Sequence, residues 1–371
     1  MSSVPNSDDP RAVPRMIIVA GARPQFIKAA PVCAALTALA LNVRILHTGQ
    51  HYDPEMSRVF FEELGIPEPA WNLECGGGSH GEMTGAMLAG IEEVLLEEMP
   101  RMVLVFGDTN STLAGALAAA KLHIPVAHVE AGLRSYNRRM PEELNRICTD
   151  HLSDLLFCSS ETGRDLLARE GIVRGVHVVG DVMADIFFQT LGKLQTGGRA
   201  AEFGGPFALL TLHRAENTDD PARLRAILHA LQQSRLNIVF PMHPRTRRTL
   251  DAFDCKVPLN VQVMDSMGYY QMVSALNACS LVLTDSGGLQ KEALWAGKPC
   301  ITLREETEWP ETVASGWNTV TGANPEAILA AMQRPAPAGP PPALYGDGHA
   351  SEKIAAIVNH TLMSGVSANV A

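Results

Sequence analysis

The chain has 371 residues, a formal net charge of −10, and a composition that is 46% hydrophobic and 19% charged. A chain of this length usually exceeds a single hydrophobic core, so we expect a globular protein with two domains. The acidic balance and the lack of a long basic run argue against a nucleic-acid partner. Seven cysteines without a CxxC pair are typical of reduced thiols in the cytosol, so we predict neither a disulfide framework nor a zinc site.

The ends of the chain and its apolar stretches give no sign of targeting to a membrane. The first fourteen residues are polar and lack the apolar core of a signal peptide. The longest apolar stretch, residues 29–41, is too short to span a bilayer. We therefore expect a cytoplasmic protein without a membrane partner.

Short apolar runs alternate with helix-like segments along the first half of the chain. The runs predict strands at residues 16–21, 43–49, 102–108, 125–132, 155–160 and 176–181. Segments rich in Ala and Leu, such as residues 112–123, lie between them and predict helices. Near-continuous apolar strands separated by helices indicate a parallel sheet that is covered on both faces.

The same pattern restarts after a predicted helical connector at residues 182–196. A second series of strands is predicted at residues 207–214, 237–244, 261–265, 281–288 and 299–305. We therefore predict an α/β protein with two Rossmann-like domains facing across a cleft, at residues 15–184 and 185–350. The Pro-rich segment 334–348 is typical of a linker, and a helix at 351–365 is expected to rejoin the first domain.

Polar residues collect at the ends of six predicted strands, where open parallel sheets bind their ligands. They are Gly21 to Arg23, Gly49 to His51, Gly107 to Thr109, His128 to Glu130, His213 with Arg214, and Asp285 to Gly288. Packing alone does not explain glycine, histidine, arginine or an acid at so many strand ends. We therefore expect a ligand site there.

The segment LTDSGGLQKEALWAG joins a predicted strand to a helix through Ser286, Gly287 and Gly288. Glycines let a ligand approach the backbone, and the N-terminus of a helix attracts phosphate. Glu292 lies one turn into this helix, where its carboxylate could bind both ribose hydroxyls of a nucleotide. The alternative is an ordinary tight turn followed by a solvated glutamate.

A second predicted helix start, GARPQFIK, carries Arg23 and Lys28. A guanidinium and an ammonium both suit a diphosphate leaving group. The alternative is a pair of surface cations on a helix.

Three acids and one histidine are candidates for proton transfer. Glu130 and Glu142 share the segment 126–150 with four arginines, and an unpaired buried carboxylate is costly. They are therefore either ion-pair partners of these arginines or groups that move protons. Asp108 ends a predicted strand, where it could also be a helix N-cap, and His213 could be an ordinary structural histidine.

Eight motifs occur in order along the chain: GARPQFIK, GQHYDPEMS, GDTNST, HVEAGLRS, PEELNR, VGDVMAD, TLHRAEN and TDSGGLQKEA. Together they resemble the non-hydrolysing UDP-N-acetylglucosamine 2-epimerases, over residues 15 to 325. The resemblance implies a glycosyltransferase-B-type fold and an isomerase that acts on a UDP-linked 2-acetamido sugar. It also implies a homodimer and no metal or other cofactor.

The resemblance implies roles for the matching positions. Catalytic roles fall to Asp108, Glu130, Glu142 and His213, and substrate-binding roles to Arg23, Lys28, Ser286, Gly287, Gly288 and Glu292. Stretching the C1–O bond of the sugar acidifies C2–H, so elimination of UDP gives a glycal and re-addition gives the epimer. The nearby arginines are expected to offset the charge of the acids.

Gln25 and Trp309 depart from the family pattern, which has Glu and Arg at these positions in many members. GARPQFIK and TEW also resemble relatives that epimerise UDP-2,3-diacetamido-2,3-dideoxyglucuronate. Our leading hypothesis is interconversion of UDP-GlcNAc and UDP-ManNAc for cell-surface polysaccharide precursors. The alternatives are the diacetamido uronate, a hydrolysing 2-epimerase, a UDP-sugar glycosyltransferase and a non-catalytic sensor of sugar nucleotides.

Some enzymes of this kind use a second, activating UDP-GlcNAc molecule. Gln50 and His51 match positions of that site, but residues 79–90 contain no arginine. We therefore expect activity without an activator.

Overall fold

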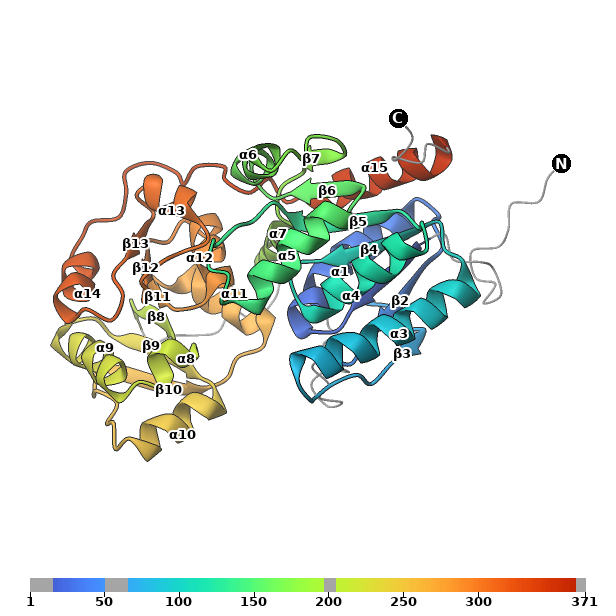
Figure 1. The fold of residues 1–371 in the computed structure, drawn as a ribbon. Coiled ribbons are helices and arrows are strands. Elements are labelled where there is room, and N and C mark those ends of the chain that lie inside the picture. The colour runs from blue at the N-terminus through green and yellow to red at the C-terminus, as the bar shows by residue number, and fades with distance from the viewer. Residues whose placement is uncertain (1–15, 51–65, 197–204, 365–371) are drawn as a thin grey trace. The chain divides into compact units, whose positions relative to one another are not determined.

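The computed structural model describes residues 16–50, 66–196 and 205–364. These residues form two compact units, each built on a parallel sheet (Figure 1). The first unit contains the described residues up to Ile186 and those from Tyr345 onward, and the second runs from Phe187 to Leu344. The predicted α/β fold with two Rossmann-like sheets is confirmed.

The first sheet has seven strands in the order β3-β2-β1-β4-β5-β6-β7, and all its pairings are parallel. The strands are β1 (Met16–Ala20), β2 (Val43–His47), β3 (Trp71–Asn72), β4 (Met102–Phe106), β5 (Val126–Ala131), β6 (Leu155–Cys158) and β7 (Val176–Val178). The strand order reverses between β1 and β4, and such a switch point is where open α/β sheets bind ligands.

Helices cover both faces of this sheet. They are α1 (Arg23–Ala38), α3 (His80–Glu98), α4 (Asn110–Lys121), α5 (Pro141–Leu152), α6 (Glu161–Arg169), α7 (Val182–Gln195), which continues into the second unit, and α15 (Ala350–Ser364). Alternate strand residues face opposite sides, so Ile18 packs in the core with α1 and α15, while Ile17 packs with α3 and α4. Burial on both sides explains the continuous apolar runs.

The second sheet has six strands in the order β10-β9-β8-β11-β12-β13 and repeats the same topology. The strands are β8 (Ala208–Thr211), β9 (Ile238–Met242), β10 (Val261–Asp265), β11 (Leu281–Thr284), β12 (Cys300–Thr302) and β13 (Asn318–Val320). Its switch point lies between β8 and β11. The short strands β3 and β13, of two and three residues, were not predicted.

The helices of the second unit again form two layers (Figure 1). They are α8 (Ala215–Thr218), α9 (Pro221–Gln233), α10 (Pro244–Ala252), α11 (Tyr269–Ala278), α12 (Gly287–Trp295), α13 (Pro310–Ala314) and α14 (Pro325–Met332). The Pro-rich segment 334–348 forms neither helix nor strand, as predicted. Within the described part of the chain, no helix combines the length and apolarity needed to cross a membrane.

Candidate active site

At the first switch point, the turn after β1 leads through Gly21 into α1. A β-carbon on Gly21 would lie 1.9 Å from the Thr48 hydroxyl oxygen and 2.2 Å from that of Ser111, so no larger residue fits. Arg23 begins α1 and is exposed, while Lys28 lies further along the helix and is partly buried. The predicted cations thus occupy different environments.

Lys28 is bound to Glu130, with Nζ 2.5 Å from the carboxylate. The two side chains are only 15% and 12% exposed. Burial by itself lowers the pKa of Lys28, but Glu130, Asp181 and Asp108 outweigh it, so the pKa is raised and the ammonium stays charged. The sequence predicted a role for Lys28 at the diphosphate. That role stays a prediction, because the partner found here is Glu130.

Glu130 has a strained backbone, with a φ of +72°. The pairing of β5 with β6 is irregular between Val129 and Ala131, so Glu130 lies in a bulge. A non-glycine residue in this region costs about 1–3 kcal/mol, and such strain gathers at functional sites. The surrounding structure therefore holds Glu130 where an unconstrained strand would not place it.

Asp108 follows β4 and pairs with Arg146 of α5. The neighbouring Thr109, rather than Asp108, is the N-cap of α4. The N-cap reading of Asp108 is therefore wrong. Asp108 and Glu130 both contribute to raising the pKa of Lys28, so the three charged groups interact within one cluster.

The adjacent Glu142 and Glu143 at the start of α5 differ completely in environment. Glu142 is exposed, whereas Glu143 is fully buried and accepts hydrogen bonds from the backbone N–H groups of Ser135 (2.9 Å) and Tyr136 (2.8 Å). Burial by itself raises the pKa of Glu143. The hydrogen bonds and the charge of Arg146 lower this pKa by more than burial raises it, so it lies below its ordinary value. Glu143 is structural, while Glu142 can meet a ligand. Sequence analysis did not single out Glu143.

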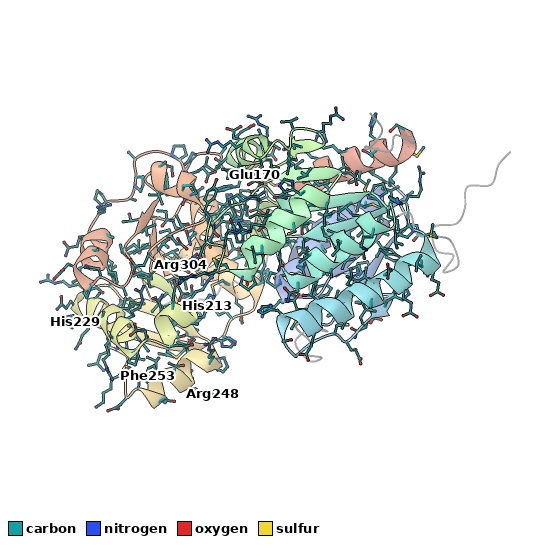
Figure 2. The ribbon with its side chains drawn as sticks, viewed as in Figure 1. Glu170, His213, His229, Arg248, Phe253 and Arg304 are labelled. Carbon is teal, nitrogen blue, oxygen red and sulfur yellow. The ribbon has the colours of Figure 1, made fainter. Side chains whose placement is uncertain are left out.

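At the second switch point, Asp285 shapes the turn that carries His213. Asp285 is fully buried, and its carboxylate accepts hydrogen bonds from the backbone N–H groups of His213 (3.0 Å) and Arg214 (2.9 Å). Figure 2 labels His213. Its ring is about half exposed, and its Nδ1 lies 3.4 Å from Asp285. Burial lowers the pKa of His213, and the nearby Arg214 and His243 lower it as well. Asp285 raises it, but by less, so the pKa of His213 lies below its ordinary value. His213 is a neutral imidazole near pH 7.

The helix α12 begins directly after Ser286, and no side chain caps its N-terminus. Gly287 and Gly288 form its first turn, and a β-carbon on Gly288 would meet nothing within 4 Å. An uncapped helix start with open space beside it suits an anion. Glu292 is only 7% exposed and accepts a hydrogen bond from the Tyr269 hydroxyl at 3.1 Å, so it is not a solvated surface glutamate.

Trp309, which departs from the family pattern, supports this helix start. Its indole Nε1 donates to the carbonyl of Gly287 at 2.9 Å. The ammonium of Lys291 lies 3.7 Å from the centre of a Trp309 ring, a cation–π contact. Trp309 therefore packs against α12 and stabilises its first turn.

Gln25, the other departure, joins the two turns of the first switch point. Its Oε1 accepts the N–H of Gly21 at 2.8 Å, and its Nε2 donates to the carbonyl of Phe106 at 3.0 Å. A glutamate could not make the second bond as a carboxylate, so the amide suits this place.

Gln50 accepts hydrogen bonds from the Ser111 backbone N–H (3.0 Å) and hydroxyl (2.8 Å) at the start of α4. His51 lies outside the described residues. Whether this position contributes to an activator site stays a prediction.

The sequence matches the UDP-N-acetylglucosamine 2-epimerase family over residues 34–359. The chain belongs to this family. The membership predicted from the eight motifs is confirmed, and with it the assignment to the isomerases.

Similar proteins cover nearly the whole chain. The UDP-2,3-diacetamido-2,3-dideoxy-D-glucuronate 2-epimerase of Pseudomonas aeruginosa is 50% identical over 92% of this chain and 98% of its own length. A Methanocaldococcus jannaschii UDP-GlcNAc 2-epimerase, solved with UDP-GlcNAc and UDP, has a TM-score of 0.83 and 41% identity, covering 93% of this chain and 99% of its own. A calicheamicin glycosyltransferase with 17% identity, covering 96% of both chains, shares the fold with a TM-score of 0.53.

Proposed function

We propose that this family member inverts C2 of a UDP-linked 2-acetamido sugar by eliminating UDP and adding it back. The observation that carries the proposal is Glu130, a strained carboxylate held by the Lys28 ammonium at 2.5 Å within a cluster that includes Asp108. A strained, fixed acid suits a reaction that removes a proton from carbon, because a general base must be positioned before the bond breaks.

The reaction would proceed in two halves. A carboxylate takes the C2 proton, the C1–C2 double bond forms, and the C1–O bond breaks with its electron pair leaving on UDP. A proton then returns to C2 from the opposite face, and UDP oxygen adds to C1. Two faces of one carbon require more than one acid–base group, and Asp108, Glu130 and Glu142 supply three carboxylates.

The second unit would bind the departing UDP. The uncapped N-terminus of α12 stabilises negative charge that builds up on the diphosphate. Glu292 lies on the same helix and would accept the ribose hydroxyls. His213, as a neutral imidazole, can donate to or accept from the substrate without adding a charge.

The comparisons favour UDP-2,3-diacetamido-2,3-dideoxyglucuronate over UDP-GlcNAc as the substrate. The Pseudomonas relative named for this uronate is 50% identical, against 43% for the Methanocaldococcus jannaschii UDP-GlcNAc 2-epimerase. Gln25 and Trp309, which resemble that group of relatives, both have specific structural partners here. UDP-GlcNAc is the second candidate, because relatives that bear its name span most of the chain.

The test is to incubate the protein with each sugar nucleotide in heavy water and to identify the products by NMR. We expect the C2 epimer of the uronate, with deuterium at C2 and UDP still attached. Epimer without deuterium would overturn the elimination mechanism. Accumulation of free sugar and UDP would show a hydrolysing enzyme, and conversion of UDP-GlcNAc alone would reverse the choice of substrate.

A further inference from the structure

His128 lies inside the first unit and is not exposed to solvent. Its side chain is fully buried on β5, two residues before Glu130. Nδ1 lies 2.7 Å from a carboxylate oxygen of Asp150, and Nε2 lies 2.7 Å from the carbonyl oxygen of Gly107. His128 is the first residue of the motif HVEAGLRS, but neither the resemblance nor the reaction proposed above gives this histidine a role.

The two partners decide the charge of the ring. A carbonyl oxygen and a carboxylate oxygen only accept hydrogen bonds, so both ring nitrogens must carry a proton. The second oxygen of Asp150 accepts from Arg134 Nη1 at 2.6 Å and from the Gly132 N–H at 3.2 Å, and the charged guanidinium favours the carboxylate form of Asp150. Moving the proton from His128 to Asp150 would place a neutral acid beside the buried guanidinium and would weaken these bonds.

Several charged and titratable groups surround His128 and Asp150, and the charged ones pair with groups of opposite sign. They are Asp150 on α5, Arg134 after β5, Glu170 at the end of α6, and the Cys158 thiol of β6, with His151 and Asp108 farther out. Arg134 binds Glu170, which is labelled in Figure 2, through two hydrogen bonds of 2.7 Å. Burial raises the pKa of the Cys158 thiol to about 12, so it adds no charge. Each buried charge therefore has an opposite neighbour.

The other end of His128 holds the turn that carries Asp108. Gly107 has a φ of +63°, its N–H donates to the Val129 carbonyl at 3.0 Å, and its carbonyl accepts from His128. The next carbonyl, that of Asp108, accepts from Asn145 Nδ2 at 3.0 Å. Two successive peptide groups are thus fixed by side chains of β5 and α5.

We propose that His128 is a doubly protonated imidazolium that positions Asp108 for the epimerase reaction through the Gly107 carbonyl. The proposal rests on the proposed function for the reaction, but not for the charge of the ring. His128 is a positioning residue, because it reaches the reacting atoms only through the turn. A neutral ring could keep only one of its two hydrogen bonds to Asp150 and Gly107, and the turn would then be free to shift.

The first experiment measures the charge directly in the wild-type protein. Histidine nitrogens are labelled with ¹⁵N, and the His128 signals are assigned by their loss in His128→Gln. We expect both ring nitrogens to carry a proton in the folded protein at neutral pH, because each faces an acceptor oxygen. One unprotonated nitrogen at neutral pH would overturn the proposal, whether or not the protein has epimerase activity.

The second experiment separates positioning from folding and from the reaction itself. His128→Gln is expected to lower kcat by roughly 100-fold, as a displacement of a catalytic group by about 1 Å can do, while UDP affinity is unchanged. The matched control is His123→Gln, because His123 is exposed, and its kcat should equal that of the wild type. Asp150→Asn removes the counterion instead and should also lower kcat without changing UDP affinity.

Three outcomes are decisive. Unchanged kcat in a folded His128→Gln variant would refute the positioning role. If His128→Gln does not fold, Asp150→Asn decides, and wild-type kcat in that variant would refute the role. A wild-type protein that converts neither sugar nucleotide would refute the proposed function, while the NMR result would still settle the charge of His128.

Discussion

The two switch points have the same topology but hold their functional groups by different means. At the first, between β1 and β4, charged side chains hold one another: Lys28 binds Glu130, and Arg146 binds Asp108. At the second, between β8 and β11, a buried acid holds the backbone: Asp285 accepts N–H groups from the turn after β8.

The difference matches the two tasks of the proposed reaction. Proton transfer at carbon requires acids whose position and charge are fixed, and ion pairs supply both. Binding of a diphosphate requires backbone N–H groups and room for the ligand, which a glycine turn and an uncapped helix supply. Each switch point can therefore be disrupted separately, with a different kinetic result.

The largest effect is expected from removing the acids of the first switch point. Glu130→Gln and Glu142→Gln should each lower kcat by about 10²- to 10⁴-fold, since each removes a proposed acid–base group. Only Glu130→Gln should also lower the free energy of unfolding, by about 1.5–3 kcal/mol, because Lys28 loses its charged partner. Steady-state kinetics measure kcat of both variants, and urea unfolding measures their stability. An equal loss of stability in the two variants would contradict a buried, paired Glu130 and an exposed Glu142.

At the second switch point, Glu292→Ala should weaken UDP binding roughly 10- to 100-fold and change kcat much less, because Glu292 is expected to bind ribose. Tyr269→Phe, which removes the hydroxyl that donates to Glu292, should weaken binding by about tenfold at most. Calorimetry with UDP measures both. Wild-type affinity in Glu292→Ala would show that the ribose lies elsewhere.

Acid should destabilise the first unit through Glu143 and Asp150. Their pKa values lie below the ordinary 4.5 and 3.8, so the unfolded chain takes up protons first as the pH falls. Their stabilisation is complete above those ordinary values and is lost as the pH drops through the lowered ones. Glu143→Gln should therefore lower the unfolding free energy at pH 7 and flatten its fall below about pH 4.5. Glu142→Gln is the matched control, because Glu142 is exposed, and it should keep the wild-type unfolding free energy at pH 7.

The smallest effect is expected for an activator. Starting from the pure manno-configured UDP-sugar, turnover should begin without a lag, because Gln50 is engaged with Ser111 at the start of α4. Progress curves with and without a trace of the gluco epimer test this. A lag that the trace abolishes would reveal an activating site, and effector and substrate would then strengthen each other's binding.

Much of the fold followed from local patterns. Strands β1, β4 and β5 were predicted from their apolar runs, because a strand that is buried on both faces consists mainly of apolar residues. The glycine turns at the strand ends marked both switch points, and at the first one a β-carbon on Gly21 would clash with the hydroxyls of Thr48 and Ser111.

By itself, the sequence determined the α/β class, the family and the residue types of the site. Only the tertiary structure decided which glutamate is buried and which cation each acid binds. Glu142 and Glu143 are chemically identical neighbours, and the burial of the second depends on Ser135 and Tyr136. Glu130 pairs with Lys28, about a hundred positions away, because the parallel strands β1, β4 and β5 bring distant segments to the same sheet edge.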